Sequence, residues 1–445
     1  MTRGIEADET AEPAAAAPDA SARPHTPAPL DPFDPRAPFD IEGHDFAFDD
    51  IPDLHDVLAA ARARKPYAVV PFLGTRALLF LTHDLVTAAF KDEEAFPASA
   101  IYAATTEPVL GHTIQCMRGA EHRINRKLVV PAFRRRVVTE QVEAILEPLA
   151  HELVDGFAAR GETDLVAEFT HVYPVRVITR LLGLPMDDED RFRRWAVDLF
   201  HFPMAPEAAE RASREFTEYV TPIVARRRRD PGHDLLSSLA HTEAEGRRLT
   251  DEEILSFLRL LFPAGADTTY LGLGNALFAL LTHSEQLSQA LADPDTELEW
   301  VVEEALRWEP PVGLLPRMCP APVSDWQGLG LDIPAETPLI FAITAANRDP
   351  ARYPDPDVFD IGRRARATLA FGDGPHVCPG TWLALAEIRA ALKVLLERLP
   401  ELRLSAPARV RGLLGTALRG PESLPVRFGL RAGDVTKPAR PSAAG

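Results

Sequence analysis

Cysteine is scarce in this sequence, with three residues among 445: Cys116, Cys319 and Cys378. Cysteines so few and so widely spaced exclude a disulfide framework and are typical of a protein in a reducing cytoplasm. Long apolar runs are also lacking, since no stretch approaches the roughly 18 residues that span a bilayer. Residues 1–8 hold no apolar signal core. The sequence therefore predicts a cytoplasmic protein without a membrane anchor.

Basic residues are fewer than acidic ones: the chain has 48 Lys and Arg and 66 Asp and Glu, which gives a net charge of −18. This balance argues against nucleic acid and against an anionic membrane surface as partners. A hydrophobic content of 46% is enough for a substantial core. Residues 1–40 hold eight prolines and many alanines, which predicts a disordered tail. We expect one folded domain at residues 41–432 and a second disordered tail at residues 433–445.

A glycine-punctuated loop at residues 371–380 presents Cys378 just before a strongly helical run at residues 381–399. A sulfur near a helix N-terminus is favoured as a thiolate. Three glycines permit a positive φ or a close approach to a flat group: Gly372, Gly374 and Gly380. Taken alone, such a segment is a glycine-rich turn with a buried free cysteine. The spacing Phe-x-x-Gly-x-His-x-Cys-x-Gly is more specific, because it fixes five positions.

These residues resemble the haem-ligand loop of the cytochrome P450 monooxygenases, and further motifs in the same order extend the resemblance over about residues 50–430. The resemblance implies a mainly α fold in a single domain, with a large helical part and a small β-rich part. It also implies haem b as the cofactor, with the Cys378 thiolate as axial iron ligand. The loop residues that would contact the haem are Phe371, Gly372, His376, Cys378 and Gly380.

His122 and Arg126 stand four residues apart, so on a helix they share one face. Without further context this is a solvated basic helix. The resemblance implies instead that both side chains hold haem propionates, together with Arg317 and His376. Four basic groups around two carboxylates suit a buried dianion.

A local basic patch contrasts with the acidic background of the chain. Between Arg118 and Arg136 there are seven Lys or Arg residues against Glu121 alone. Such a patch is typical of a docking surface. The resemblance places it on the cysteine side of the haem, so the expected partner is an acidic ferredoxin or flavodoxin-type electron donor. NAD(P)H would supply that donor through a separate reductase, since the sequence leaves no room for a redox module.

A long helix is predicted from Thr250 to about Leu281, because Thr250 and Glu253 form a capping-box pattern. Pro263 lacks an N–H group and should bend this helix. Two adjacent threonines after a glycine are poor helix formers, so local propensity is sacrificed here. Such conflicts are expected at functional sites.

The resemblance assigns roles within this helix. Ala264 and Gly265 would leave room for O2, while Asp267 and Thr268 would deliver protons. The alternative is a polar notch on a buried helix.

Glu304 and Arg307 stand at i and i+3, where helical side chains meet. The resemblance implies a buried structural triad of these two residues with Arg363. It also makes residues 93–115, where Glu107 is the one charge after Glu94, a flexible loop over an apolar substrate. The implied pocket residues are Ile101, Tyr102, Val312, Leu314, Leu315, Thr416 and Ala417.

Apolar spacing predicts the remaining elements. The expected helices are residues 52–62, 84–91, 140–159, 164–182, 187–200 and 207–229, and the expected strands are residues 67–72, 77–81 and 310–317.

The sequence thus predicts a haem-thiolate monooxygenase that oxidises an apolar organic molecule with O2 and two electrons from a separate protein. The alternatives are a peroxide-driven peroxygenase and a haem-thiolate binding or sensor protein without turnover. Asp267 and Thr268 argue against the peroxygenase, because peroxide needs no proton relay. The substrate, the regiochemistry, the natural redox partner, the pathway and the oligomeric state cannot be read from the sequence.

Overall fold

The structure is a computed structural model that describes residues 31–51, 53–200, 202, 204–366, 368–405 and 413–431. Most of the two predicted tails lies outside these residues, so the predicted domain limits stay predictions. The described residues from Phe39 onward form one compact unit, separate from residues 31–38. Residues 31–38 are turns, in which Asp34 accepts hydrogen bonds from Arg36. The architecture below is that of the larger unit.

Helices dominate this unit. They are α1 (Leu54–Arg62), α2 (His83–Lys91), α3 (Ala98–Thr105), α4 (Glu107–Leu110), α5 (Gly119–Val129), α6 (Arg135–Gln141), α7 (Glu147–Asp155), α8 (Tyr173–Leu181), α9 (Glu189–Phe200), α10 (Pro206–Arg229), α11 (Leu235–His241), α12 (Asp251–Thr282), α13 (Ser284–Ala292), α14 (Pro294–Trp308), α15 (Ile343–Ala346) and α16 (Thr381–Arg398).

The strands form small sheets. They are β1 (Tyr67–Phe72), β2 (Thr75–Phe80), β3 (Glu162–Asp164), β4 (Leu314–Cys319), β5 (Thr337–Ala342), β6 (Arg403–Leu404), β7 (Leu413–Leu414), β8 (Gly420–Pro421) and β9 (Pro425–Arg427). The largest sheet has the order β1-β2-β5-β4, in which β2 and β5 are parallel and the other pairs antiparallel. The predicted fold class, mainly α with a small β-rich part, is confirmed.

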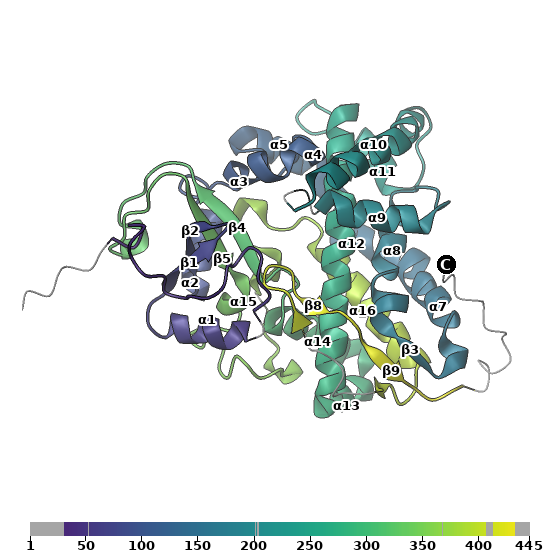
Figure 1. The fold of residues 1–445 in the computed structure, drawn as a ribbon. Helices are drawn as coiled ribbons and strands as arrows, with labels where there is room; N and C mark the ends of the chain where they lie inside the picture. Colours follow the sequence, from purple (N-terminus) through teal and green to yellow (C-terminus); the bar gives the residue numbers. More distant parts are fainter. Residues whose placement is uncertain are drawn as a thin grey trace, which may run out of the picture. The chain divides into compact units, whose positions relative to one another are not determined.

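Helix α12 organises the helical part. It runs through the middle of Figure 1, with the β1-β2-β5-β4 sheet on one side and helices α7 to α10 on the other. The predicted capping box is present, since the Thr250 side chain accepts from the Glu253 N–H and the Glu253 side chain accepts from the Thr250 N–H. The helix continues through Pro263 without interruption. Most of its residues are buried, so it supplies a rigid central wall for whatever lies beside it.

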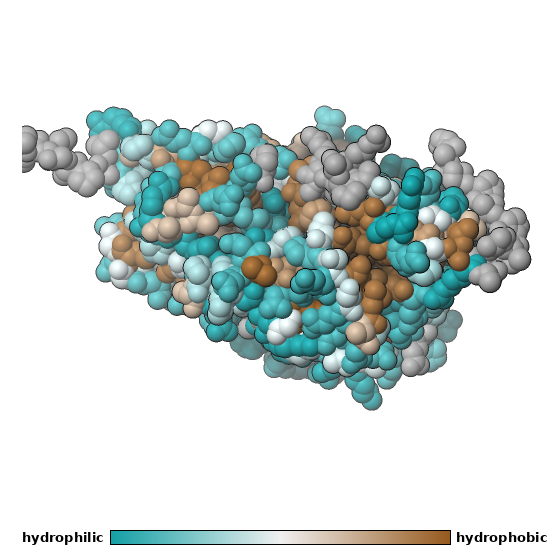
Figure 2. All heavy atoms as spheres, turned by 90° about the horizontal axis from the view of Figure 1, so that it is seen from below, coloured by the Kyte–Doolittle hydropathy of each residue, from teal (hydrophilic) through white to brown (hydrophobic). Residues whose placement is uncertain are grey.

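Two apolar clusters hold much of the core among the described residues. The larger one joins α7 to α12, α14 and α16, and the smaller one joins α1 to the four-stranded sheet. On the face drawn in Figure 2, hydrophilic residues predominate and hydrophobic residues reach the surface in a few patches. Among the helices of the described part of the chain, none is both long and apolar enough to cross a bilayer.

Two sequence expectations need correction, and one needs a refinement. Residues 140–155 are helical as expected, with a π-helical turn at Val142–Leu146. Residues 164–182 are not one helix, because a turn at residues 171–172 separates the π-helical turn Val166–Thr170 from α8. Residues 93–115 are not an irregular loop, because they contain α3 and α4. Tertiary hydrogen bonds hold this segment: Ser213 Oγ donates to the Val109 carbonyl at 2.6 Å, and Arg259 Nε to the Leu110 carbonyl at 2.9 Å.

Candidate functional site: the Cys378 loop and the α12 groove

The loop at residues 371–380 owes its shape to two of its glycines. Gly372 and Gly374 both have a φ of +71°, a region that favours glycine. A Cβ on Gly374 would also collide with the Phe90 carbonyl at the end of α2. The loop closes where the Cys378 N–H donates to the Phe371 carbonyl at 2.9 Å. The cysteine is therefore held in one place by backbone geometry.

The backbone N–H groups of Gly380 and Thr381 point to the Cys378 sulfur and favour its thiolate, while the Thr381 hydroxyl donates to the Cys378 carbonyl at 2.8 Å. Gly380 itself has an ordinary φ of −83° and caps α16, so its predicted left-handed freedom is not used. Cys378 keeps exposed surface although protein atoms surround it on most sides. That surface therefore faces an interior space, and burial raises the pKa of the thiol.

Two predicted propionate ligands, His122 and Arg126, lie on α5 and reach this loop together. Arg126 Nη1 donates to the Val377 carbonyl at 2.7 Å, and the His122 ring lies 4.0 Å from the His376 ring. Burial and the neighbouring basic groups lower the pKa of His122 to about 4. Its Nε2 is buried without a described partner. A buried polar atom left unpaired costs stability, so this position favours an added acceptor.

Arg317 and His376 complete the predicted set. Arg317 is 5% exposed on β4, and its Nη1 donates to the Tyr102 hydroxyl at 3.3 Å. His376 Nε2 lies 3.2 Å from a Glu93 carboxylate oxygen. Burial opposes ionisation of Glu93, but its hydrogen bond and ion pair with His376 lower the pKa overall. One half-buried carboxylate thus meets several basic groups, which leaves positive charge in excess.

These residues fit a haem. A soft sulfur donor stands at one point, and basic side chains with one orphaned buried nitrogen gather nearby, as a porphyrin with two carboxylates requires.

The predicted oxygen groove on α12 has a distinct surface. Four residues at helical spacing in this otherwise buried stretch remain partly exposed: Leu261, Ala264, Gly265 and Thr268. Thr268 Oγ1 donates to the Ala264 carbonyl at 2.8 Å, so the hydroxyl is held on this face. Asp267 is 6% exposed. The burial of Tyr270 and the negative charge of Asp267 raise the pKa of Tyr270 to about 12. The groove therefore has small residues, one placed hydroxyl and one adjacent buried carboxylate.

The structure brings the three predicted triad residues together. Glu304 binds Arg307 through two hydrogen bonds of 2.8 Å, and Arg363 Nε lies 3.3 Å from the same carboxylate. Glu304 and Arg307 are 3% and 1% exposed, so the cluster is buried and paired. Arg307 also donates to the Asn347 and Pro356 carbonyls, which fastens α14 to the chain that leads to the Cys378 loop.

Comparison with known proteins agrees with this geometry. The sequence profile of the family described as Cytochrome P450 matches residues 52–295 and 296–402. The chain belongs to the cytochrome P450 family. Cytochrome P450 monooxygenase PikC of Streptomyces venezuelae is 35% identical over 400 residues, which cover 87% of this chain and 92% of that protein. Mycinamicin IV hydroxylase/epoxidase of Micromonospora griseorubida is 35% identical over 380 residues, with 84% and 94% covered.

Solved structures give the same result for the fold. The cytochrome P450 PksS of Bacillus subtilis 168 superimposes with a TM-score of 0.78 at 29% identity, and the match covers 85% of this chain and 97% of that one. As a member of this family, the chain is a haem-thiolate monooxygenase.

The predicted substrate residues of this cytochrome P450 do not all share one surface. Leu314 is 3% exposed and packs in the core cluster beside α1. Side chains alternate along a strand, and Leu315 therefore shares the opposite face of β4 with Arg317. The Tyr102 hydroxyl is bound by Arg317, which places it beside a predicted propionate ligand.

Near the C-terminus, the Thr416 hydroxyl donates to the Asp49 carbonyl at 2.5 Å and accepts from the Ile51 N–H at 3.2 Å. Its polar atom is thus engaged by the segment that precedes α1. The Ala417 carbonyl accepts from the Gly313 N–H at 2.8 Å, so this turn lies against Val312 and its neighbours. Ala417 is exposed, Val312 half-buried and Ile101 buried.

A groove of about 1050 Å³ coincides with the predicted basic patch. It is lined by Arg118, His122, Arg123, Arg126, Lys127 and Arg134, with Val130, Pro131, Pro375, Glu93 and Glu94. The patch is less purely basic than the sequence indicated, because Glu93 and Glu94 join its wall and Lys127 pairs with Glu245 at 2.7 Å. Arg118, Arg123 and Arg134 remain exposed.

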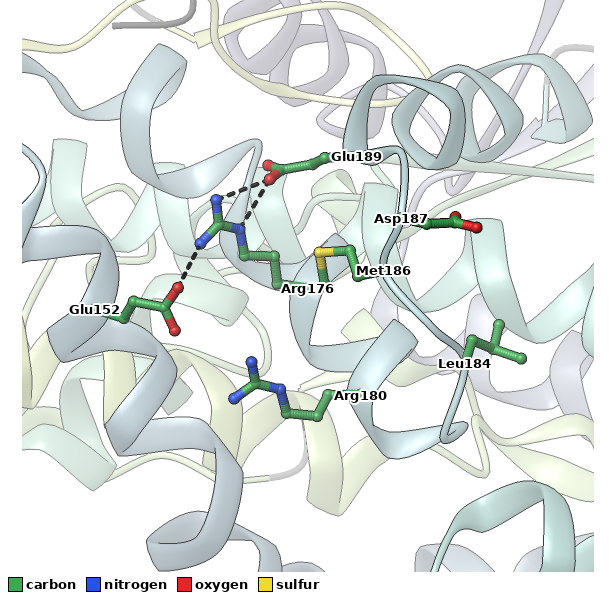
Figure 3. A pocket seen from close by; sticks show the side chains of 7 residues that line it. All are labelled: Glu152, Arg176, Arg180, Leu184, Met186, Asp187 and Glu189. Atoms are coloured by element: carbon green, nitrogen blue, oxygen red, sulfur yellow. Dashed lines mark hydrogen bonds and ion pairs between the residues drawn. The ribbon is translucent and has the colours of Figure 1, made fainter. Parts of the chain in front are cut away.

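A second cavity, of about 410 Å³, contains none of the predicted site residues. It lies between α7, α8 and the loop before α9 (Figure 3). Arg176 is paired there with Glu152 at 3.3 Å and Glu189 at 2.8 Å, which neutralises its charge. We assign this cavity no part in the oxidation.

A buried ion network behind the Thr416 turn was not predicted. Glu309 pairs with Arg419 at 2.5 Å and with His55 at 2.7 Å, and all lie at the junction of α1, α14 and β8. Burial opposes ionisation of Glu309, yet these partners lower its pKa to about 2. Glu309 and Arg419 are 110 residues apart in the chain. Only covariation of the two positions among related sequences could have indicated that they are paired.

Proposed function

We propose that this cytochrome P450 binds haem b through the Cys378 thiolate and oxidises an apolar organic molecule with electrons from an acidic donor protein. The observation that carries the proposal is the gathering of a hydrogen-bonded sulfur, several basic side chains and one orphaned buried nitrogen around one loop. When bound, the haem iron supplies the activation of O2, which no side chain can perform.

The Cys378 sulfur would hold the haem iron. The N–H groups of Gly380 and Thr381 donate to it and moderate its charge, while Pro379 has no N–H to offer. His122, Arg126, Arg317 and His376 hold the two propionates and orient the ring. His122 Nε2 gains in this way the acceptor that it lacks among the described residues.

On the α12 side, Ala264 and Gly265 keep the groove wide. Thr268 holds a proton donor at its Oγ1, and the buried Asp267 carboxyl group beside it would replace the proton that the hydroxyl gives up and would be reprotonated from solvent. This proton path supports a monooxygenase over a peroxygenase, because peroxide already carries the protons that reduction of O2 requires.

We propose an apolar substrate, contacted by Val312, Leu315, Ile101 and Ala417, because these side chains carry no charge. Two similar proteins are named for mycinamicin IV and for a bacillaene polyketide synthase. Mycinamicin IV, bacillaene and polyketides are therefore the first compounds to screen, by the spectral shift that a ligand causes when it enters the site.

The electron donor in this proposal is a ferredoxin or a flavodoxin-type protein that docks on the basic groove, reduced by NAD(P)H through a separate reductase. Support comes from the exposed Arg118, Arg123 and Arg134 in a protein of net charge −18. A cytoplasmic location belongs to the same proposal and is tested by cell fractionation.

One reconstitution tests the activity. The haem-loaded protein is mixed with NADPH, a ferredoxin and its reductase, and a compound that shifts the spectrum. Oxygenated product formed in proportion to NADPH consumed supports the proposal. Product formed only with added hydrogen peroxide identifies a peroxygenase, and ligand binding without product under either condition identifies a binding protein.

A further inference from the structure

Trp382 differs from the other tryptophans of the chain. It is 44% exposed, whereas the other four are buried or half-buried: Trp195, Trp300, Trp308 and Trp326. Three of those donate their indole N–H to a partner in the structure. Within the described part of the chain, the contact found for the Trp382 side chain is with Arg135. A single exposed apolar side chain is ordinary, so the inference rests on where this one lies.

The position of Trp382 relates it directly to the cysteine. It is the second residue of α16 and follows Cys378 by four positions. Thr381, the residue between the N-cap and Trp382, donates its hydroxyl to the Cys378 carbonyl at 2.8 Å and its N–H to the sulfur. A short bonded path thus connects the exposed indole with the predicted iron ligand.

The charged surroundings of Trp382 continue the basic groove. The Arg135 guanidinium lies 5.3 Å from the centre of its ring, and the preceding Arg134 lines the groove. Helix α16 packs against α6 and against the 3-10 turn Val130–Phe133, whose first two residues also line the groove. The indole and the groove are therefore parts of one surface.

We propose that Trp382 is the apolar anchor of this surface for an acidic electron-donor protein. The inference rests on the proposed function, in which electrons enter on the Cys378 side. Exposed arginines steer a partner of opposite charge, but they contribute little to holding it. Tryptophan is enriched among the few residues that dominate interface energies. The Arg135 contact holds the ring in place beforehand, so less side-chain freedom is lost on docking.

The test compares association and dissociation rates of the haem-loaded protein with a [2Fe–2S] ferredoxin at several salt concentrations. Trp382→Ala should raise the dissociation rate about tenfold or more, as expected for a dominant contact. It should leave the association rate and its salt dependence unchanged. Trp382→Phe, which keeps an aromatic ring, should recover most of the loss. Arg123→Glu should do the opposite, with slower association and a flatter salt dependence.

A dissociation rate that is the same in wild type and Trp382→Ala overturns the proposal, and so does a wild-type protein that does not bind the ferredoxin. The absorption of the reduced CO complex is recorded for each variant and tests the proposed haem-thiolate function separately. Because binding is measured without turnover, failure of the anchor and failure of the activity remain distinguishable.

Discussion

Two clusters of buried basic side chains in this molecule differ in how far their charge is balanced. Arg307 and Arg363 share the Glu304 carboxylate, and further carbonyls accept from both arginines. In the second cluster, Arg126 donates to one carbonyl and His122 Nε2 has no described partner.

The difference separates structure from binding. A fully paired buried network needs nothing more and fastens α14 to the chain around it. A cluster with surplus positive charge and an orphaned nitrogen is costly by itself and becomes favourable when an anion enters. We therefore interpret the Glu304 cluster as part of the scaffold and the His122 cluster as the place where haem propionates bind.

The largest effect is expected from breaking the closed cluster. Arg307→Ala leaves Glu304 as a buried carboxylate that has lost its closest partner, so the free energy of unfolding should fall by about 3 to 5 kcal/mol. Chemical denaturation followed by circular dichroism measures the change. Arg248→Ala removes an exposed ion pair with Glu243 and is the matched control, with an expected cost of about 1 kcal/mol or less. Equal costs for the two variants would refute the difference in role.

Removing the unpaired nitrogen of the second cluster should weaken haem binding and leave the stability of the fold unchanged. His122→Phe keeps the ring against His376 and removes the orphaned nitrogen. The free energy of unfolding of the haem-free protein should change by less than about 1 kcal/mol, while haem dissociates roughly tenfold faster. Transfer of haem to an excess of a haem-free globin gives the rate. A haem-free protein that loses as much stability as Arg307→Ala does would assign His122 to the scaffold.

The α12 groove should control the delivery of protons and not the binding of substrate. Thr268→Ala removes the hydroxyl that now donates to the Ala264 carbonyl. Substrate affinity and electron uptake should stay the same, while the yield of product per NADPH falls several-fold and hydrogen peroxide accumulates. Thr268→Ser keeps a hydroxyl and should retain coupling. Equal product yields in all three proteins would exclude this role.

The smallest expected effect concerns the sulfur. Pro379 lacks the N–H that another residue would offer, which leaves the donors of Gly380 and Thr381. If the missing donor matters, Pro379→Leu should raise the ferric/ferrous potential slightly, because hydrogen bonds to the ligand withdraw charge. Spectroelectrochemical titration decides. No change with an intact fold means that Pro379 only stiffens the loop.

Much of the fold and of the site could be predicted from patterns of residues that are close together in the sequence. The capping box of Thr250 and Glu253 and the glycines at positions 372 and 374 act within a few residues of chain, so they can be read directly. The i, i+3 pairing of Glu304 with Arg307 is equally local.

What the sequence could not give depends on distant partners. Which of Leu314 and Leu315 packs in the core cluster beside α1 follows from the pairing of β4 with β5. Helices α3 and α4 have a weak pattern of their own and are fixed by Ser213 and Arg259. The pairing of Glu309 with Arg419 requires two segments far apart in the chain.

The central claim is that the sulfur of Cys378 is the iron ligand, and the absorption of the reduced CO complex tests it most directly. The wild-type protein should show the red-shifted band of a thiolate-ligated haem, and Cys378→Ser should lose it. Cys116→Ala and Cys319→Ala change the other two cysteines, both buried, and should keep it. A Cys378→Ser protein that retains the band would contradict the account.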